Sequence, residues 1–390
     1  MSVLRDAHTS PVTARRESKR TRFSLPKHKQ TVLALQGGGA LGAYQAGVYE
    51  GMAERGFAPN WVAGVSIGAI NAALIAGNPP ERRIERLVAF WDRVSSGIPI
   101  IPPAYLDPLR LAFNRVSAMA TTAFGVPGFF VPRVPPPYLA PEGSPGALSV
   151  YDTTPLKETL EELVDFDLIN RKEMRLSVGA VDIHTGNSVY FDNQRQRIEA
   201  EHVMASGALP PGFPPVVIDG NHYWDGSIVS NSPLWYVLDD SPGINALIMQ
   251  VDLFSARGDL PKNLDEVLER SKDIQYSSKT RFNTTRATEL ENVRAALGRF
   301  LRKLPAKLRD DPDYRRLAPL SERKRHITIV HLINRRLAHA SSAKDYEFSR
   351  ATVHQLWEGG LEDVRRSCAN PSWHRAAESV NGVQVFDLAT

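Results

Sequence analysis

The stretch WVAGVSIGAINAALIAG, residues 61–77, decides how the sequence around it folds. WVAGV (61–65) is a short apolar run typical of a buried strand, and the small apolar residues after it continue for the length of a helix. Ser66 stands where the two meet, with Gly64 and Gly68 on either side. A sharp turn from strand to helix points its central residue out of the sheet and has no room for side chains two residues away. The pattern predicts a strand, a tight turn with an exposed serine, and a helix.

A similar unit precedes this one. TVLALQ (31–36) is typical of a fully buried strand, GGG (37–39) interrupts it, and residues 41–56 have apolar positions at helical spacing. Residues 81–95 predict an amphipathic helix. Two successive strand-to-helix units predict an α/β protein, a three-layer α/β/α fold with a mainly parallel central sheet.

The rest of the chain divides by composition. We expect a basic disordered tail (1–29), a main domain (30–261) and a basic helical C-terminal extension packed on it (262–390). Residues 97–149 contain eleven prolines and several aromatic residues, which predicts an irregular flap without long regular elements. The flap is either an ordinary surface loop or a cover over an apolar substrate channel. Further strands are expected at 174–182, 188–191, 216–220, 222–226, 244–253 and 326–333, and further helices at 152–164, 199–209, 263–303 and 344–367.

Composition limits the kinds of protein this can be. No apolar stretch reaches the roughly 18 residues of a membrane span, and the N-terminus lacks the apolar centre of a secretory signal. Cys368 is the one cysteine among 390 residues, so a disulfide framework and a cysteine-built metal site are excluded. We therefore expect a cytoplasmic protein.

Charge is distributed unevenly. Residues 1–29 hold eight Lys or Arg and two Asp or Glu, so this segment has a net charge of +6. The formal net charge of the whole chain is +4. Residues 262–336 carry a further +9, from 19 basic and 10 acidic residues. Such regions are either solvated helical faces or contacts to an anionic membrane or lipid granule. Few aromatic residues lie among the basic ones, so no nucleic acid partner is expected.

Gly37, Gly38 and Gly39 follow the first predicted strand. An ester attacked by a serine develops an oxyanion, which bare backbone N–H groups stabilise at least cost. With Gly42 the same loop also fits the G-x-G-x-x-G pattern of dinucleotide binding, but that pattern expects an acidic residue at the end of the second strand. The second strand ends instead in Ser66, which favours an oxyanion hole.

The serine needs a base. His326, His331, His339, His354 and His374 come late in the chain, as in the common order of serine hydrolases, but none lies in a glycine-flanked turn.

Asp225, followed by Gly226, is placed in a tight turn after a short strand. A carboxylate held there could take the serine proton directly. The alternative is that Asp225 only caps its own turn.

Four motifs in order carry a resemblance to a known family: GGGALG (37–42), GVSIG (64–68), ASGALPPGFPP (205–215) and YWDGSIVSNSPL (223–234). Together they resemble the patatin-like phospholipases over about residues 30–253. The resemblance implies a serine acyl hydrolase with Ser66 as nucleophile, Asp225 as base and the N–H groups of Gly38 and Gly39 as the oxyanion hole. Gly37, Gly42, Gly64, Gly68 and Gly226 are the motif glycines.

The chain departs from the family pattern at two positions. Leu41 stands where members often have Arg or Lys, so no role with a phosphate headgroup is assigned to it, and Ser227 replaces a more usual glycine or alanine. The predicted function is hydrolysis of carboxylic ester bonds of lipids, with no metal and no cofactor. The alternatives are an esterase for short acyl esters or a polyester, and a lipid- or granule-surface binding protein of low activity.

Overall fold

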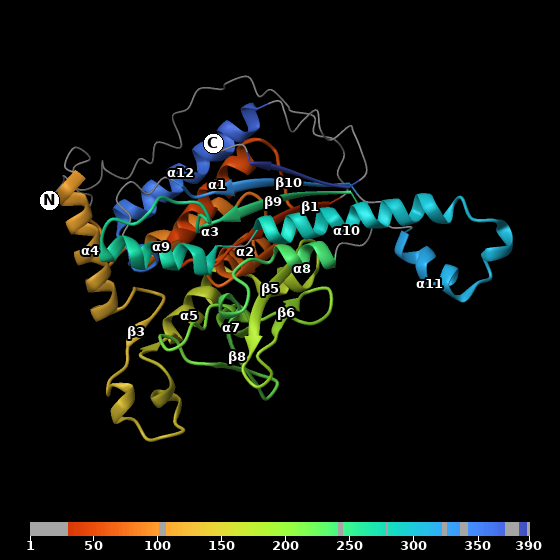
Figure 1. The fold of residues 1–390 in the computed structure, drawn as a ribbon. Helices are drawn as coiled ribbons and strands as arrows, with labels where there is room; N and C mark the ends of the chain where they lie inside the picture. Colours follow the sequence, from red (N-terminus) through yellow and green to blue (C-terminus); the bar gives the residue numbers. More distant parts are fainter. Residues whose placement is uncertain are drawn as a thin grey trace.

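A computed structural model describes residues 30–100, 107–240, 245–277, 280–321, 326–335, 342–370 and 382–387 (Figure 1). The predicted tail, residues 1–29, lies outside the described residues. The strands are β1 (Gln30–Leu35), β2 (Trp61–Val65), β3 (Val131–Pro132), β4 (Tyr151–Asp152), β5 (Arg175–Asp182), β6 (Ser188–Asp192), β7 (Val216–Ile218), β8 (Asn221–Asp225), β9 (Ala246–Asp252), β10 (His326–Ile333) and β11 (Gly382–Asp387).

The helices of the described chain are α1 (Ala43–Glu54), α2 (Ile67–Ala76), α3 (Arg83–Val94), α4 (Asp107–Phe124), α5 (Thr154–Leu163), α6 (Phe166–Asn170), α7 (Ala200–Ser206), α8 (Leu234–Asp239), α9 (Leu264–Tyr276), α10 (Thr280–Leu301), α11 (Pro312–Ser321) and α12 (Arg350–Ala369). Short 3₁₀ turns include η1 (Gly39–Gly42), η4 (Gly226–Ile228) and η6 (Lys344–Tyr346).

Nine of the described strands form one sheet in the order β11-β10-β9-β1-β2-β5-β8-β7, with β6 also paired to β5. The strands from β11 to β5 are parallel, whereas β6, β7 and β8 are antiparallel to their neighbours. The predicted mainly parallel sheet is therefore confirmed, and the strands expected at 216–220 and 222–226 are present as the antiparallel pair β7 and β8.

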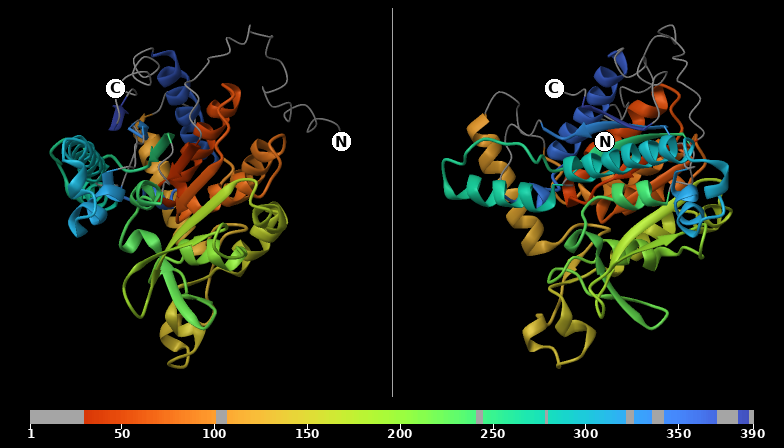
Figure 2. Two further views of the ribbon diagram at one scale, coloured as in Figure 1. Left: turned by 90° about the vertical axis from the view of Figure 1, so that its right-hand side faces the viewer. Right: turned by 45° about the vertical axis from the view of Figure 1, so that its right-hand side comes forward.

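Helices cover both faces of this sheet, as the tandem strand-to-helix units predict. On β1, Leu33 and Leu35 point into a large core with α1, α2, α3 and α12, while Val32 and Ala34 point into a smaller core with α8. Figure 2 shows α10 on the opposite side of the sheet from α1 and α3. Alternate residues of a strand bury on opposite faces, which explains why β1 is apolar throughout.

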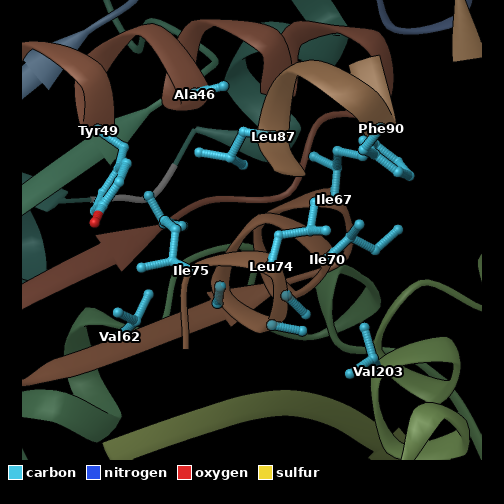
Figure 3. Packing of buried hydrophobic residues seen from close by; sticks show 14 of the residues in the cluster. Ala46, Tyr49, Val62, Ile67, Ile70, Leu74, Ile75, Leu87, Phe90 and Val203 are labelled. Carbon is cyan, nitrogen blue, oxygen red and sulfur yellow. The ribbon is translucent and has the colours of Figure 1, made fainter. Parts of the chain in front are cut away.

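Helix α2 lies at the centre of the larger core. All of its ten residues are buried, as expected for a helix that is apolar on every side. Figure 3 shows Ile70 and Leu74 of this helix close to Leu87 and Phe90 of α3, with Val203 of α7 on another side. Because α2 follows Ser66 directly, this packing fixes the position of the serine.

One expectation about regular structure was wrong. The flap contains an 18-residue helix, α4, because residues 107–124 hold a single proline, Pro108, placed in the first turn where a helix tolerates it. The predicted helical C-terminal region is present as α9 to α12, and the central sheet continues beyond β9 in two strands of the same region, β10 and β11. Of these, β10 matches the strand predicted at 326–333. Among the described helices none is both long and apolar enough to span a bilayer.

Candidate active site

Ser66 lies on a strained turn between β2 and α2. Its backbone has φ 56° and ψ −127°, a conformation that costs a residue with a side chain of order 1–3 kcal/mol. A Cβ at Gly64 would lie 2.2 Å from the Gly68 carbonyl oxygen, and one at Gly68 would lie 2.4 Å from the Leu35 carbonyl oxygen. The turn therefore closes only with glycine at both positions, and the positive end of α2 faces Ser66.

Strand β5 brings Asp225 to the serine. Val65, at the end of β2, pairs with Gly179, and Asp225, at the end of β8, pairs with the next residue of β5, Ala180. The pairing of β2 with β5 ends at Gly179, and β8 pairs with the following residues on the same edge of β5. Val65, the residue before Ser66, and Asp225 therefore pair with consecutive residues on one edge of β5, although 159 positions separate Ser66 from Asp225 in sequence.

The two oxygens of Asp225 have different surroundings. Oδ1 accepts a hydrogen bond from the Ser227 N–H at 2.8 Å, which is the turn capping that the sequence offered as an alternative role. Oδ2 is buried and has no hydrogen bond of ordinary geometry in the described part of the chain. Burial raises the pKa of Asp225 to about 6, opposed by the nearby Ser66 hydroxyl, which favours the charged form.

The glycine loop lies beside the serine. Gly39 has φ +55°, and a Cβ there would lie 2.2 Å from the Asp345 carbonyl oxygen. Neither the Gly38 nor the Gly39 N–H donates a hydrogen bond to another described residue, so both are free to bind an anionic oxygen. The loop ends at a buried leucine, Leu41, which rules out contact of this side chain with a headgroup.

Three other motif glycines allow close packing. A Cβ at Gly37 would lie 2.4 Å from the Asn231 Oδ1, at Gly42 2.5 Å from the Ile67 Cγ1, and at Gly226 2.6 Å from the Gly179 carbonyl oxygen.

A small cavity of about 70 Å³ opens at Ser66. Gly37, Gly38 and Gly39 line it together with Ser66, whereas the buried Asp225 does not line it. Ile67, Ile70 and Leu209 also line the cavity, and aromatic rings form much of its remaining lining: Phe129, Phe130, Phe213, Phe254, Tyr276, Tyr346 and Phe348. The cavity is thus an apolar space with its polar groups concentrated at the serine, an arrangement typical of ligand sites.

A family model described as patatin-like phospholipase matches residues 33–238, more than half of the chain. The chain belongs to the patatin-like phospholipase family. A second family model, described as patatin phospholipase, matches residues 274–379. The search of curated proteins finds no match. Among solved structures, the chain is similar to VipD from Legionella pneumophila, with 15% identity, a TM-score of 0.30, and coverage of 85% of this chain and 67% of that chain.

Membership in the patatin-like family confirms the resemblance found in the sequence, and it supports lipid acyl hydrolase activity.

Buried polar side chains hold this patatin-like site in place, and sequence reasoning missed most of them. The Ser206 Oγ accepts a hydrogen bond from the Ser66 N–H at 3.0 Å and donates to the Gly179 carbonyl at 2.5 Å, so it joins the serine turn to β5. The Asn231 Nδ2 donates to the Gly37 carbonyl at 3.1 Å and to the Tyr276 carbonyl at 2.8 Å. These bonds couple the turn, the glycine loop and α9.

Gln36 is a third such residue. Its Nε2 donates to the Tyr276 carbonyl at 2.9 Å, and its Oε1 accepts from the N–H groups of Leu253 and Phe254, at 2.5 and 3.0 Å. A fully buried glutamine at the end of an apolar strand is the signal that could have pointed to it. Its bonds fix the glycine loop against the end of β9.

The histidines considered as bases lie elsewhere in this patatin-like fold. His326 and His331 are on β10, separated from β1 by β9, and His354 is on the exposed side of α12. His339 and His374 lie outside the described residues. Cys368 is buried on α12, where burial raises the pKa of its thiol to about 11.

Proposed function

We propose that the protein hydrolyses carboxylic esters of lipids through a Ser66–Asp225 dyad, with the Gly38 and Gly39 N–H groups as the oxyanion hole. The observation that carries this proposal is the register of β5. It pairs Val65 and Asp225 with consecutive residues of β5, and the Ser66 hydroxyl is near enough to Asp225 to favour its charged form. Burying a carboxylate costs free energy of folding. A role for Asp225 as the acceptor of the Ser66 proton accounts for its buried position.

The reaction proceeds through an acyl-enzyme. The Ser66 Oγ attacks the ester carbonyl carbon while its proton passes to the Asp225 Oδ2. The carbonyl oxygen becomes an oxyanion that the Gly38 and Gly39 N–H groups stabilise. Collapse breaks the bond to the leaving alkoxide, which takes the proton from Asp225 and departs as the alcohol. A water molecule then gives a proton to Asp225 and attacks the acyl-enzyme. Collapse of this second intermediate breaks the bond to Ser66, which takes the proton back and releases the acid.

Fluorophosphonate labelling and hydrolysis of p-nitrophenyl esters test this function. Ser66→Ala should abolish both, and Asp225→Asn should lower kcat/KM by at least 100-fold because it removes the proton acceptor. The matched control is Asp182→Asn, which changes an aspartate two residues beyond Ala180 on the same strand and should keep wild-type activity. Full activity in either dyad variant contradicts the proposal.

A lipid- or granule-surface binding protein of low activity is the competing function. It predicts a folded protein that fluorophosphonates leave unlabelled but that binds anionic vesicles. The basic segment 1–29, at +6, would supply the contact, so its removal should weaken vesicle binding. Comparing kcat/KM for p-nitrophenyl esters of increasing acyl chain length distinguishes a lipid hydrolase from an esterase for short chains.

A further inference from the structure

A second, larger hollow lies next to the catalytic cavity. This groove has a volume of about 630 Å³ and runs between α4, α9 and the segment 342–346. Tyr346 lines both spaces, so the two adjoin at this residue. Figure 1 places α4 and α9 at the same end of the molecule.

The catalytic cavity alone is too small for a lipid chain. An engineered protein cavity of roughly 150 Å³ binds one benzene molecule, whereas the space at Ser66 is about 70 Å³. Packed rings fill the rest of the site: Phe129 lies 5.8 Å from Phe213 and 6.0 Å from Phe348 between ring centroids. A long substrate chain must therefore lie mainly outside this cavity. The groove has the size of an ordinary ligand pocket.

The groove is apolar along most of its length. Ala118, Met119 and Ala123 of α4 line it, and Ala343 lies on the wall formed by the segment 342–346. Two further facts mark its polar end. The Arg115 Nη2 lies 2.9 Å from the Asp265 Oδ2, and the Ser342 Oγ donates to the Asp265 Oδ1 at 2.6 Å. An apolar trough whose charges are already paired with each other suits an unbranched hydrocarbon chain.

Ion pairs of the two residues before Tyr346 hold its backbone in place, whereas its ring makes no hydrogen bond to a described residue. The Lys344 Nζ pairs with Glu269 at 2.9 Å and with Asp273 at 2.6 Å. Asp345 pairs with the Lys272 Nζ at 2.7 Å.

The Tyr346 hydroxyl, by contrast, has no hydrogen bond to any described residue, and the residue is 41% exposed. The ring also contacts the Lys272 ammonium, 5.2 Å from its centroid. Rotation of the ring therefore breaks no hydrogen bond.

We propose that the groove between α4 and α9 binds the hydrocarbon chain of the substrate, and that the Tyr346 ring is a gate between this groove and Ser66. The proposal rests on the proposed lipid hydrolase function, and it adds where the chain lies and which residue controls its passage.

Binding is tested without catalysis, in the Ser66→Ala protein, by titration with a fluorescent fatty acid of eighteen carbons. Adding Ala123→Trp places an indole in the groove and should weaken binding at least tenfold. Adding Ala112→Trp makes the same change at an exposed position of α4 outside the groove, and should leave binding unchanged. Equal affinity in all three proteins overturns the groove, whether or not the wild type is an enzyme.

The gate is tested by the ratio of kcat/KM for p-nitrophenyl palmitate to that for the butyrate. Tyr346→Ala removes the ring and should raise the ratio at least fivefold, whereas Tyr346→Phe keeps the ring and should keep the ratio of the wild type. Ala123→Trp should lower the ratio at least tenfold. An unchanged ratio in Tyr346→Ala overturns the gate. If fluorophosphonate did not label the wild type, the proposed function would be refuted. The titration with the fatty acid would still test whether the groove binds a hydrocarbon chain.

Discussion

In the proposed Ser66–Asp225 dyad, a buried aspartate takes the role that a histidine has in other serine hydrolases. An aspartate at its ordinary pKa of 3.8 is a weak base, and burial raises the pKa of Asp225 to about 6. At neutral pH the group is still mostly ionised, yet it accepts a proton far more readily than an exposed aspartate. The same burial makes the folded state sensitive to the charge on this one residue.

The rate of ester hydrolysis should follow the ionisation of Asp225. We expect kcat/KM for p-nitrophenyl butyrate to be level above pH 7 and to fall below about pH 6, approaching tenfold per pH unit, because only the carboxylate accepts the serine proton. Steady-state rates from pH 4.5 to 9 measure this. If the residual activity of Asp225→Asn falls over the same pH range, another group is the base.

The free energy of unfolding should also depend on the ionisation of Asp225, but it should decrease as pH rises whereas activity increases. Because the folded-state pKa of Asp225 is raised, its charge costs stability above about pH 6, and this cost disappears as pH falls toward 4. Asp225→Asn should therefore be more stable than the wild type at pH 8, by at most ~3 kcal/mol, with little difference at pH 4. Urea unfolding at both pH values measures this.

Asp182 provides the control. Hydrogen bonds from Thr185 lower the pKa of Asp182, so its charge stabilises the folded state at pH 8 and Asp182→Asn should destabilise it there. A loss of stability in Asp225→Asn at pH 8 would contradict the assigned burial of its charge.

The sequence could reveal the residues of the site that stand in short local patterns. Ser66 between its glycines, the glycine loop and Asp225 in its turn each follow from the geometry of a few neighbouring positions. Ser206 lies in the motif ASGALPPGFPP (205–215) and Tyr346 in none, but the contacts of both depend on partners from distant segments. Their places could be found only once β5 and the segment 342–346 had been positioned in space.

The close contact between helices α1 and α12 depends on individual glycines. A Cβ at Gly360 would lie 2.1 Å from the Tyr44 carbonyl oxygen, whereas one at the adjacent Gly359 would lie 3.8 Å from the Tyr44 ring. Both glycines lower helix propensity by up to about 1 kcal/mol relative to alanine. Only Gly360 is required for the two helices to approach.

This pair gives a matched prediction. Gly359→Ala should stabilise the protein by about 0.5–1 kcal/mol, because it improves helix propensity and makes an ordinary contact. Gly360→Ala should destabilise it by roughly 1–3 kcal/mol, because backbone atoms have to move apart. Urea unfolding of the two variants checks both signs. Equal effects would show that the α1–α12 contact adjusts freely.

Most elements of the fold could be predicted because periodicity is a local property. Helices α1, α3 and α5 and strands β1, β2 and β9 were all expected near their observed positions. Helix α4 was missed because the proline count of the whole flap concealed one stretch with a single proline. The charged helical stretch expected at 263–303 contains two helices, α9 and α10. Strand β11 was not expected, since its six residues acquire their role only by pairing with β10.

The whole molecule is closed by its C-terminal part. β10 pairs with β9 along its full length, and α12 covers the glycine-rich face of α1, so residues beyond 261 complete both the sheet and the larger core. The segment 342–349 also lies over the glycine loop, where the Asp345 carbonyl meets Gly39. Structural support for the site thus comes from both ends of the chain, although its predicted nucleophile, base and oxyanion donors all precede residue 226.

Truncation tests this dependence. A chain of residues 1–261 would leave the β9 edge unpaired and the apolar surface beneath α12 exposed, so we expect it to aggregate or lack a cooperative thermal transition. A chain of residues 30–390 keeps every described strand and helix and should retain the melting temperature of the full protein within about 2 °C, since a shift of that size is under 1 kcal/mol. Circular dichroism melts and gel filtration measure both. A folded, active 1–261 protein would show instead that the C-terminal region is a separate appendage, and the groove beside Tyr346 would then lie outside the enzyme proper.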